Sequence, residues 1–141
     1  MPDPLVPFLT GQSLLYDRAL AELRGGRLRS DWTGLIFPQL EGLAADIGNA
    51  EPTLKSPTEV RAFLDHPLLG RRLAVCVATL QGLVYMTAAE ILGPEGAERL
   101  HISLTAFAAI GHRPLYSVAL QRWFGMAHPG AIRWIEEASR R

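Results

Sequence analysis

The segment that most constrains the fold runs from Pro67 to Met86 and reads PLLGRRLAVCVATLQGLVYM. Its main apolar residues recur at steps of four, three and four positions, which places them on one face of an α-helix. These residues are Leu69, Leu73, Cys76 and Leu80. Alanines and valines cover much of the remaining circumference. Because a helix that is apolar nearly all round is normally buried on most sides, we predict that this segment is the buried central helix of the domain.

The same segment is too polar and too short to cross a membrane. Arg71 and Arg72 interrupt it early, and the apolar stretch after them is far below the roughly 20 residues that a bilayer needs. The N-terminal residues MPDPLVPFL contain no basic region and no long apolar run, so no signal peptide is predicted. These features favour a cytoplasmic protein with no membrane partner.

The length and the charge of the chain narrow its class further. With 141 residues the chain can bury a substantial core, so one domain over 1–141 is expected. The formal net charge is zero, which argues against broad binding to nucleic acid. The lone cysteine, Cys76, excludes an internal disulfide and is expected to be a small, unreactive core side chain.

Helix start and stop signals in the first part of the chain predict a helix between two irregular segments. Three prolines within residues 1–10 predict an extended lead-in, because proline opposes a helix interior. The helix that follows has Glu22 on its water-facing side, and Gly25 and Gly26 end it. Residues 40–55 have few caps and weak periodicity, so we predict a long loop, of the kind that often serves as a lid or a binding loop.

The remaining signals are those of helices alone. The sequences SPTE at 56–59 and TAAE at 87–90 both match the capping box of a helix start. The helix that opens at 87–90 is expected to stop at Gly93, and another is expected over 97–110. We find no convincing strand and no internal repeat. The sequence therefore predicts an all-α, multihelical domain of about seven or eight helices.

Metal and nucleophile motifs are missing from the sequence. The four histidines include no pair at the spacing of a helical zinc site, and Cys76 has no cysteine partner, so neither a metal nor a cofactor is expected. There is no GxSxG motif. Ser103 lies on an otherwise apolar helix, where a hydroxyl usually bonds back to the backbone, although a role in a site is an alternative.

Two glycines and two arginines before a predicted helix start form a candidate anion site. Backbone N–H groups there, together with Arg27, Arg29 and Ser30, could hold an anion. The simpler alternative is a helix stop followed by solvated arginines.

Next to these arginines lies a candidate cleft for a planar ligand. Trp32, Phe37 and Gln39 could line it with two rings and an amide, although aromatic residues near proline more often belong to a core. Asp31 is the one carboxylate that we name as a candidate catalytic base, and as a helix cap it also has a structural role.

Several motifs carry a resemblance to a known bacterial family. The chain contains YDRALAELRGGRLRSDWTGLIFPQLEGL, then EVRAFLDHPLLGRRL, and later SLTAFAA and RWFG. In this order they resemble the family catalogued as domain of unknown function 1810, which genome projects often label calpastatin. The match covers about residues 8–129 and implies a mainly helical fold without an established activity. The matching positions that the resemblance implies as site residues are Arg29, Ser30, Trp32, Phe37, Gln39, His66 and Ser103.

The chain also departs from the family pattern. The usual basic-Ser-His-Trp-x-Trp stretch reads RSDWTG at 29–34, so Asp31 replaces the histidine and Gly34 replaces the second tryptophan. If these positions line a pocket in the family, we expect the pocket of this chain to bind something else or to have lost a family chemistry.

We therefore carry a leading hypothesis with two alternatives. The leading one is a pocket for a small anionic or nucleotide-like ligand. We expect residues 27–39, the loop after them and the helix carrying Ser103 to form this pocket. Both binding alone and conversion of the ligand are compatible with the sequence. This hypothesis predicts that Trp32 is partly exposed in a concavity with Arg29 pointing in. One alternative is a non-catalytic interaction module or homodimer with an exposed C-terminal face of Trp123, Phe124, Met126 and Trp134. The other alternative is a specialised enzyme of a biosynthetic or resistance pathway.

Overall fold

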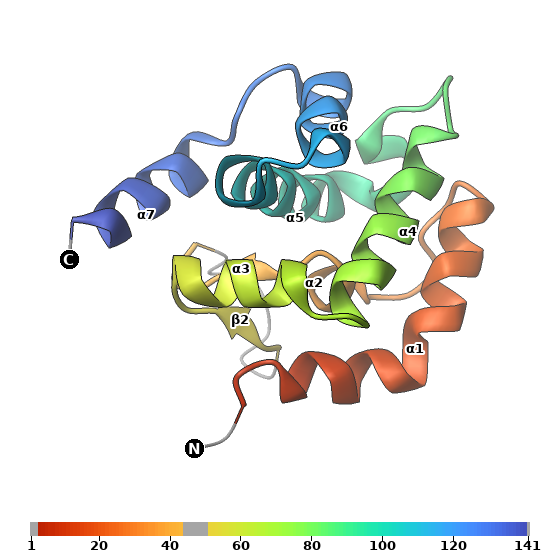
Figure 1. Ribbon diagram of the computed structural model, residues 1–141. Helices are drawn as coiled ribbons and strands as arrows, with labels where there is room; N and C mark the ends of the chain where they lie inside the picture. Colours follow the sequence, from red (N-terminus) through yellow and green to blue (C-terminus); the bar gives the residue numbers. More distant parts are fainter. Residues whose placement is uncertain (1–2, 44–50, 141) are drawn as a thin grey trace.

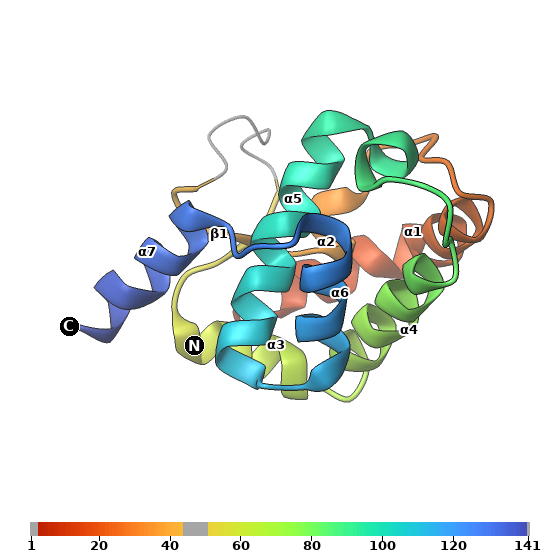
Figure 2. The ribbon, with the colours of Figure 1, turned by 90° about the horizontal axis from the view of Figure 1, so that it is seen from above.

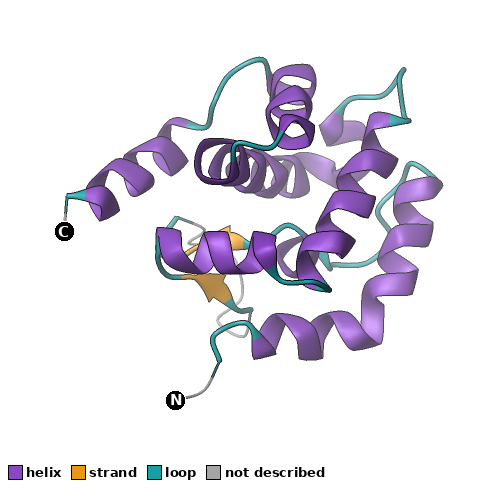
Figure 3. Ribbon diagram, in the orientation of Figure 1, coloured by secondary structure: helices purple, strands orange, loops and turns teal. Residues whose placement is uncertain are grey.

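A computed structural model describes residues 3–43 and 51–140 of the chain. Over these residues it contains seven helices and one pair of two-residue strands (Figures 1 and 3). In chain order the elements are α1 (Val6–Arg24), α2 (Thr33–Ile36), β1 (Gln39–Leu40), β2 (Thr53–Leu54), α3 (Pro57–Asp65), α4 (Leu69–Gln81), α5 (Ala88–Gly111), α6 (Pro114–Phe124) and α7 (Pro129–Ser139). The predicted all-α, multihelical class is confirmed.

The buried central helix is α5 and not the segment around α4. Helix α5 has α6 on one side and α2 with α3 on the other, while α4 lies at the side of the molecule (Figures 1 and 2). Six consecutive residues of α5, Ile102 to Phe107, are buried, whereas α4 exposes Arg71, Val75 and Ala78. The prediction that α4 is the central helix is therefore wrong, although α4 is apolar nearly all round. Its exposed apolar residues, such as Val75 and Ala78, are small side chains that are tolerated at a protein surface.

A break at Gly93 divides α5 into two parts. The first part opens with the predicted capping box, in which Thr87 and Glu90 exchange hydrogen bonds of 2.9 and 3.1 Å. Gly93 then adopts φ 77° and ψ 166°, a conformation open to glycine, and Pro94 begins the second part. The predicted stop at Gly93 is thus present as this break, and one wall of a cleft described below begins there.

The predicted extended lead-in over residues 1–10 is wrong for the described part of that range. Helix α1 already begins at Val6, with Pro7 in its first turn. Proline lacks only an N–H that would have no partner in a first turn, so it is compatible with this place. Asp3 supports the start, because its Oδ1 accepts a hydrogen bond of 2.9 Å from the N–H of Leu5.

The predicted loop over 40–55 contains the only strand pair of the described chain. Strands β1 and β2 are parallel, with Gln39 opposite Thr53 and Leu40 opposite Leu54. The pair was missed because two residues are too few to show an alternating pattern. Residues 44–50 of the predicted loop lie outside the described residues. The pairing brings the residues before β2 beside those before β1, so that Glu51 lies close to Gly34.

One prediction concerns the close approach of α3 and α4. A Cβ on Gly70 would collide with the carbonyl oxygen of Leu64, which is fixed backbone. Gly70→Ala should therefore lower the free energy of unfolding by about 1–3 kcal/mol, the usual cost of overpacking, as measured by urea denaturation. Gly82→Ala is the matched control: Gly82 is exposed, has φ −75° and would place its Cβ 3.4 Å from the nearest atom. An equal effect of both substitutions would contradict the proposed contact.

Candidate functional site

A buried carboxylate near the end of α1 fixes the segment that follows this helix. Glu22 is 9% exposed. Its Oε1 accepts hydrogen bonds from the backbone N–H groups of Arg29 (2.8 Å) and Ser30 (3.1 Å) and from Nε1 of Trp32 (2.8 Å). Its Oε2 accepts a hydrogen bond of 2.8 Å from the Ser30 hydroxyl. We call this arrangement the Glu22 clamp, because four donors on one carboxylate leave little freedom to residues 29–32.

The clamp determines the charge of Glu22. Burial alone would raise the pKa of this carboxyl, but the hydrogen bonds from Arg29, Trp32 and Ser30 outweigh it and hold the pKa below its ordinary value of 4.5. The side chain is therefore ionised at neutral pH. The sequence had placed Glu22 on the water-facing side of its helix, which is wrong, because the donors of the following segment draw it inward.

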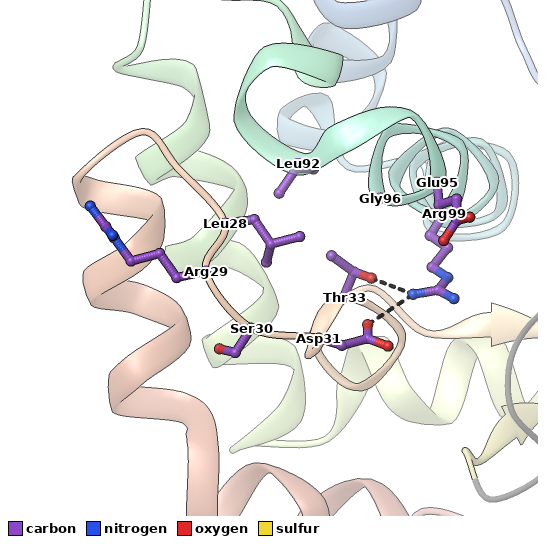
Figure 4. Close-up of a pocket in the computed structure, with 9 residues that line it drawn as sticks. All are labelled: Leu28, Arg29, Ser30, Asp31, Thr33, Leu92, Glu95, Gly96 and Arg99. Carbon is purple, nitrogen blue, oxygen red and sulfur yellow. Dashed lines mark hydrogen bonds and ion pairs between the residues drawn. The ribbon is translucent and has the colours of Figure 1, made fainter.

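The clamped segment forms one wall of a cleft of about 410 Å³, and the opposite wall is the region of α5 around its break (Figure 4). We call it the α5 cleft. Leu28 joins the two walls, because its backbone N–H donates a hydrogen bond of 2.8 Å to the carbonyl oxygen of Ile91. The lining residues are Leu28, Arg29, Ser30, Asp31, Thr33, Leu92, Glu95, Gly96 and Arg99.

Arg99 crosses the α5 cleft and ties its two walls together. Figure 4 shows the side chain reaching from α5 toward Asp31 and Thr33. Its Nη1 donates to Thr33 Oγ1 (2.8 Å) and to Asp31 Oδ1 (3.1 Å). The Arg99 side chain is only 12% exposed, whereas that of Asp31 is 72% exposed. Among the described residues no acceptor takes a hydrogen bond from Nη2 of Arg99.

The break in α5 gives the opposite wall its shape. Because the second part of α5 begins after Gly93, the partial positive charge of a helix N-terminus lies beside this wall. Gly96 allows the walls to approach, since a Cβ there would lie 3.3 Å from the methyl group of Thr33.

Glu51 is a further carboxylate near Arg99. It lies against Gly34, so a Cβ added to Gly34 would collide with the Glu51 carboxylate. The pKa of Glu51 is raised above its ordinary value. Burial is the main cause and the charge of Asp31 adds to it, whereas the nearby Arg99 acts in the opposite direction. Glu51 Oε2 is buried and has no hydrogen-bond partner among the described residues. Sequence analysis missed Glu51, Arg99 and Thr33, because only the fold brings these distant positions together.

Trp32 and Phe37 lie in the core beneath the cleft. They are 1% and 0% exposed, with ring centroids 6.1 Å apart. The predicted partial exposure of Trp32 is wrong, because the Glu22 carboxylate satisfies its indole N–H inside the protein. Arg29 does not point into the cleft either, since Figure 4 shows its guanidinium beside α1, away from Asp31 and Arg99.

Gln39 and Ser103 are also buried, and His66 lies elsewhere. The Gln39 amide donates to the carbonyl oxygens of Phe37 (3.0 Å) and Arg99 (2.9 Å), which joins β1 to α5. Gln39 Oε1 and Ser103 Oγ have no hydrogen-bond partner among the described residues. His66 Nδ1 accepts hydrogen bonds from the first N–H groups around α4, and His66 does not line the α5 cleft. Arg27 borders a different cleft, described below.

The C-terminal aromatic residues are packed against the body of the protein. Phe124 stacks on the His101 ring at 4.1 Å, and the Arg122 guanidinium lies 3.6 Å from the Trp123 ring centre. Trp134 donates a hydrogen bond to the carbonyl oxygen of Glu41. The three aromatic side chains are half-buried, and Met126 is the exposed member of the predicted face.

Residues 3–43 and 51–140 lack two further kinds of feature. Within these ranges, no three His, Cys, Asp or Glu side chains lie close enough together to hold a metal ion. None of the helices there is both long enough and apolar enough to span a bilayer.

Comparison with known proteins identifies relatives without an assigned function. Residues 2–133 match the family model described as protein of unknown function (DUF1810). A solved structure, the conserved hypothetical protein Rv1873 from Mycobacterium tuberculosis, is similar to this chain with a TM-score of 0.89 and 30% sequence identity. The match covers 95% of this chain and 99% of Rv1873. No curated protein matches the chain.

The Glu22 clamp generates a prediction about stability. Glu22→Gln keeps the side-chain shape but removes the negative charge, so the hydrogen bonds from the Trp32 indole and the Ser30 groups are no longer made to a charged acceptor. We expect a loss of about 1.5–3 kcal/mol in the free energy of unfolding at pH 7, the range for hydrogen bonds to charged groups. Glu136→Gln, at an exposed position of α7, is the matched control and should change it by less than about 0.5 kcal/mol.

The same pair of variants gives a pH dependence. Because the folded pKa of Glu22 lies below 4.5, its contribution to stability is present above pH 4.5 and is lost as the pH falls through the folded pKa. Chemical denaturation between pH 7 and pH 3 should therefore show a smaller loss of stability for Glu22→Gln than for the unaltered protein. Parallel curves for the two proteins would contradict the clamp.

Proposed function

The chain belongs to the DUF1810 family of proteins of unknown function, and we propose that it binds a small molecule with an anionic group in the α5 cleft. The observation that carries this proposal is the Arg99 side chain, which lines the cleft, is largely buried and has no hydrogen bond from Nη2 to a described residue. A guanidinium fork matches a carboxylate or a phosphate, and it binds more strongly where water is partly excluded.

Other features of the cleft support a ligand of this kind. Its volume of about 410 Å³ lies within the usual range of roughly 300–1,000 Å³ for small-molecule sites. Leu28 and Leu92 offer apolar contacts, and the Thr33 hydroxyl can still donate a hydrogen bond. The N-terminal end of the second part of α5 adds a favourable field for an anion. Because Trp32 is buried, stacking of a nucleotide base on this ring is not part of the proposal.

Asp31 has a positioning role in this proposal. Its carboxylate holds one edge of Arg99 and competes with a ligand for the positive charge. A catalytic role for Asp31 as a base is the enzyme version of the hypothesis, and it would require a substrate group beside the exposed carboxylate.

The interaction-module alternative has weaker support. It required an exposed aromatic face, whereas Trp123, Phe124 and Trp134 are half-buried against the protein itself. A mass that rises with concentration in light scattering would favour it. A cytoplasmic location and the absence of a nucleic-acid partner stay predictions from the sequence.

The α5-cleft proposal is tested by thermal unfolding against the small carboxylates citrate, malate and succinate. A ligand at one hundred times its dissociation constant adds about 2.7 kcal/mol, which should raise the Tm by several degrees. Arg99→Gln should abolish this rise, and Asp31→Asn should strengthen binding because it removes the competing charge. Arg71→Gln on the exposed face of α4 is the matched control and should bind like the unaltered protein.

The outcomes separate binding from catalysis. If Asp31→Asn still binds a ligand that the unaltered protein converts, but no longer converts it, Asp31 is a catalytic residue. If a ligand raises the Tm of Arg99→Gln as much as that of the unaltered protein, the α5-cleft proposal is wrong.

A further inference from the structure

A second cleft lies on the other side of the clamped segment, against α1. Its volume is about 340 Å³. We call it the arginine cleft, because three of its six lining residues are arginines. The lining residues are Arg18, Ala21, Glu22, Gly25, Arg27 and Arg29.

The three arginines come from two elements and share one opening. Arg18 lies on α1, while Arg27 and Arg29 lie on the segment that the clamp holds. All three are exposed, and none of their guanidinium groups has a hydrogen bond or an ion pair with a described residue. In Figure 4 the Arg29 guanidinium lies beside α1. Positive charge is thus gathered here without a partner among the described side chains.

The acidic residue of the cleft does not neutralise these arginines by direct contact. Both oxygens of Glu22 are taken by the four donors of the clamp, and none of those donors is an arginine side chain. A carboxylate so occupied has little capacity left for a guanidinium. The arginines therefore retain most of their capacity to bind an anion from solution.

The backbone that carries the arginines is held in place before any ligand binds. The N–H of Arg27 donates to the carbonyl oxygen of Glu22 (3.1 Å), and the N–H of Leu28 donates to the carbonyl oxygen of Ile91 (2.8 Å). The N–H of Arg29 is held by the clamp. An anion therefore orders mainly side chains and not the chain itself, which lowers the cost of binding.

The end of α1 also lies at this cleft, and its carbonyl groups would repel an anion if they were free. They are instead capped by the turn that follows. The carbonyl oxygens of Ala21, Glu22 and Leu23 accept hydrogen bonds from the N–H groups of Gly25, Arg27 and Gly26, respectively. Gly26 makes this turn possible, because it adopts φ 72°.

We propose that the arginine cleft binds the phosphoryl group of a small phosphorylated molecule. Three arginines that line one cleft can match the several oxygens and the double charge of a phosphate monoester, which a single carboxylate would match only in part. Nucleic acid is a poorer match, because it needs an extended basic surface and this chain has no net charge. The arginine cleft shares Arg29 with the lining of the α5 cleft, but it lies on the α1 side of the clamped segment and does not depend on the function proposed for the α5 cleft.

The test is a titration of the full-length protein with inorganic phosphate, followed in amide NMR spectra at constant ionic strength. We expect saturable shifts centred on the amides of Gly25 to Ser30. The double variant Arg27→Gln/Arg29→Gln should bind phosphate at least tenfold more weakly, although its backbone bonds are retained. The matched control Arg24→Gln/Arg71→Gln removes the same charge at exposed positions that do not line the cleft, and its affinity should stay within twofold.

Three results would overturn the proposal. The first is a shift that does not saturate, and the second is an equal loss of affinity in the test variant and in the control. The third comes from Arg99→Gln, which should leave this titration unchanged; if Arg99→Gln abolishes binding, the phosphate binds in the α5 cleft instead. Retained spectral dispersion in each variant shows that a loss of binding does not come from unfolding.

Discussion

The carboxylate of Glu22 is the acceptor on which the course of residues 27–32 depends. It collects four donors near the end of α1, and one of them is the indole N–H of a fully buried tryptophan. Without this acceptor the buried indole N–H of Trp32 would lose its partner, and an unpaired buried donor costs about 1–3 kcal/mol. Because the same segment separates the α5 cleft from the arginine cleft, one carboxylate gives both clefts their shared wall.

Features of the fold that depend on local chemistry could be predicted from the sequence, and those that depend on distant contacts could not. The capping box at Thr87 and the stop at Gly93 are encoded by residues that are neighbours in the sequence, and the structure contains both. The parallel strand pair and the burial of Glu22 join positions that no local pattern connects. Helix periodicity alone also could not decide between α4 and α5 as the central helix, because both are apolar and only packing determines which one is covered.

The candidate site also contains some residues that the sequence predicts and others that only the fold reveals. Asp31 and Ser30 were predicted and do line the α5 cleft, because the segment that carries them reaches its surface. Trp32 and Gln39 were also named, but the indole N–H of Trp32 and the amide NH2 of Gln39 donate to acceptors within the protein, beneath the cleft. Arg99 escaped notice, since a single arginine on an amphipathic helix normally faces water. Gly34 has no room for a side chain beside Glu51, so the residue types at these two positions constrain each other.

The sharpest test of the Glu22 clamp is the pKa of Glu22, measured by NMR titration of its side-chain carboxyl carbon. If Glu22 holds residues 29–32, this pKa lies below the ordinary value of 4.5, and the resonances of the Trp32 indole N–H and of the Arg29 and Ser30 amides move at the same pH. A pKa at or above 4.5, or an indole resonance that does not respond to this titration, would show that Glu22 is not the acceptor that holds the segment.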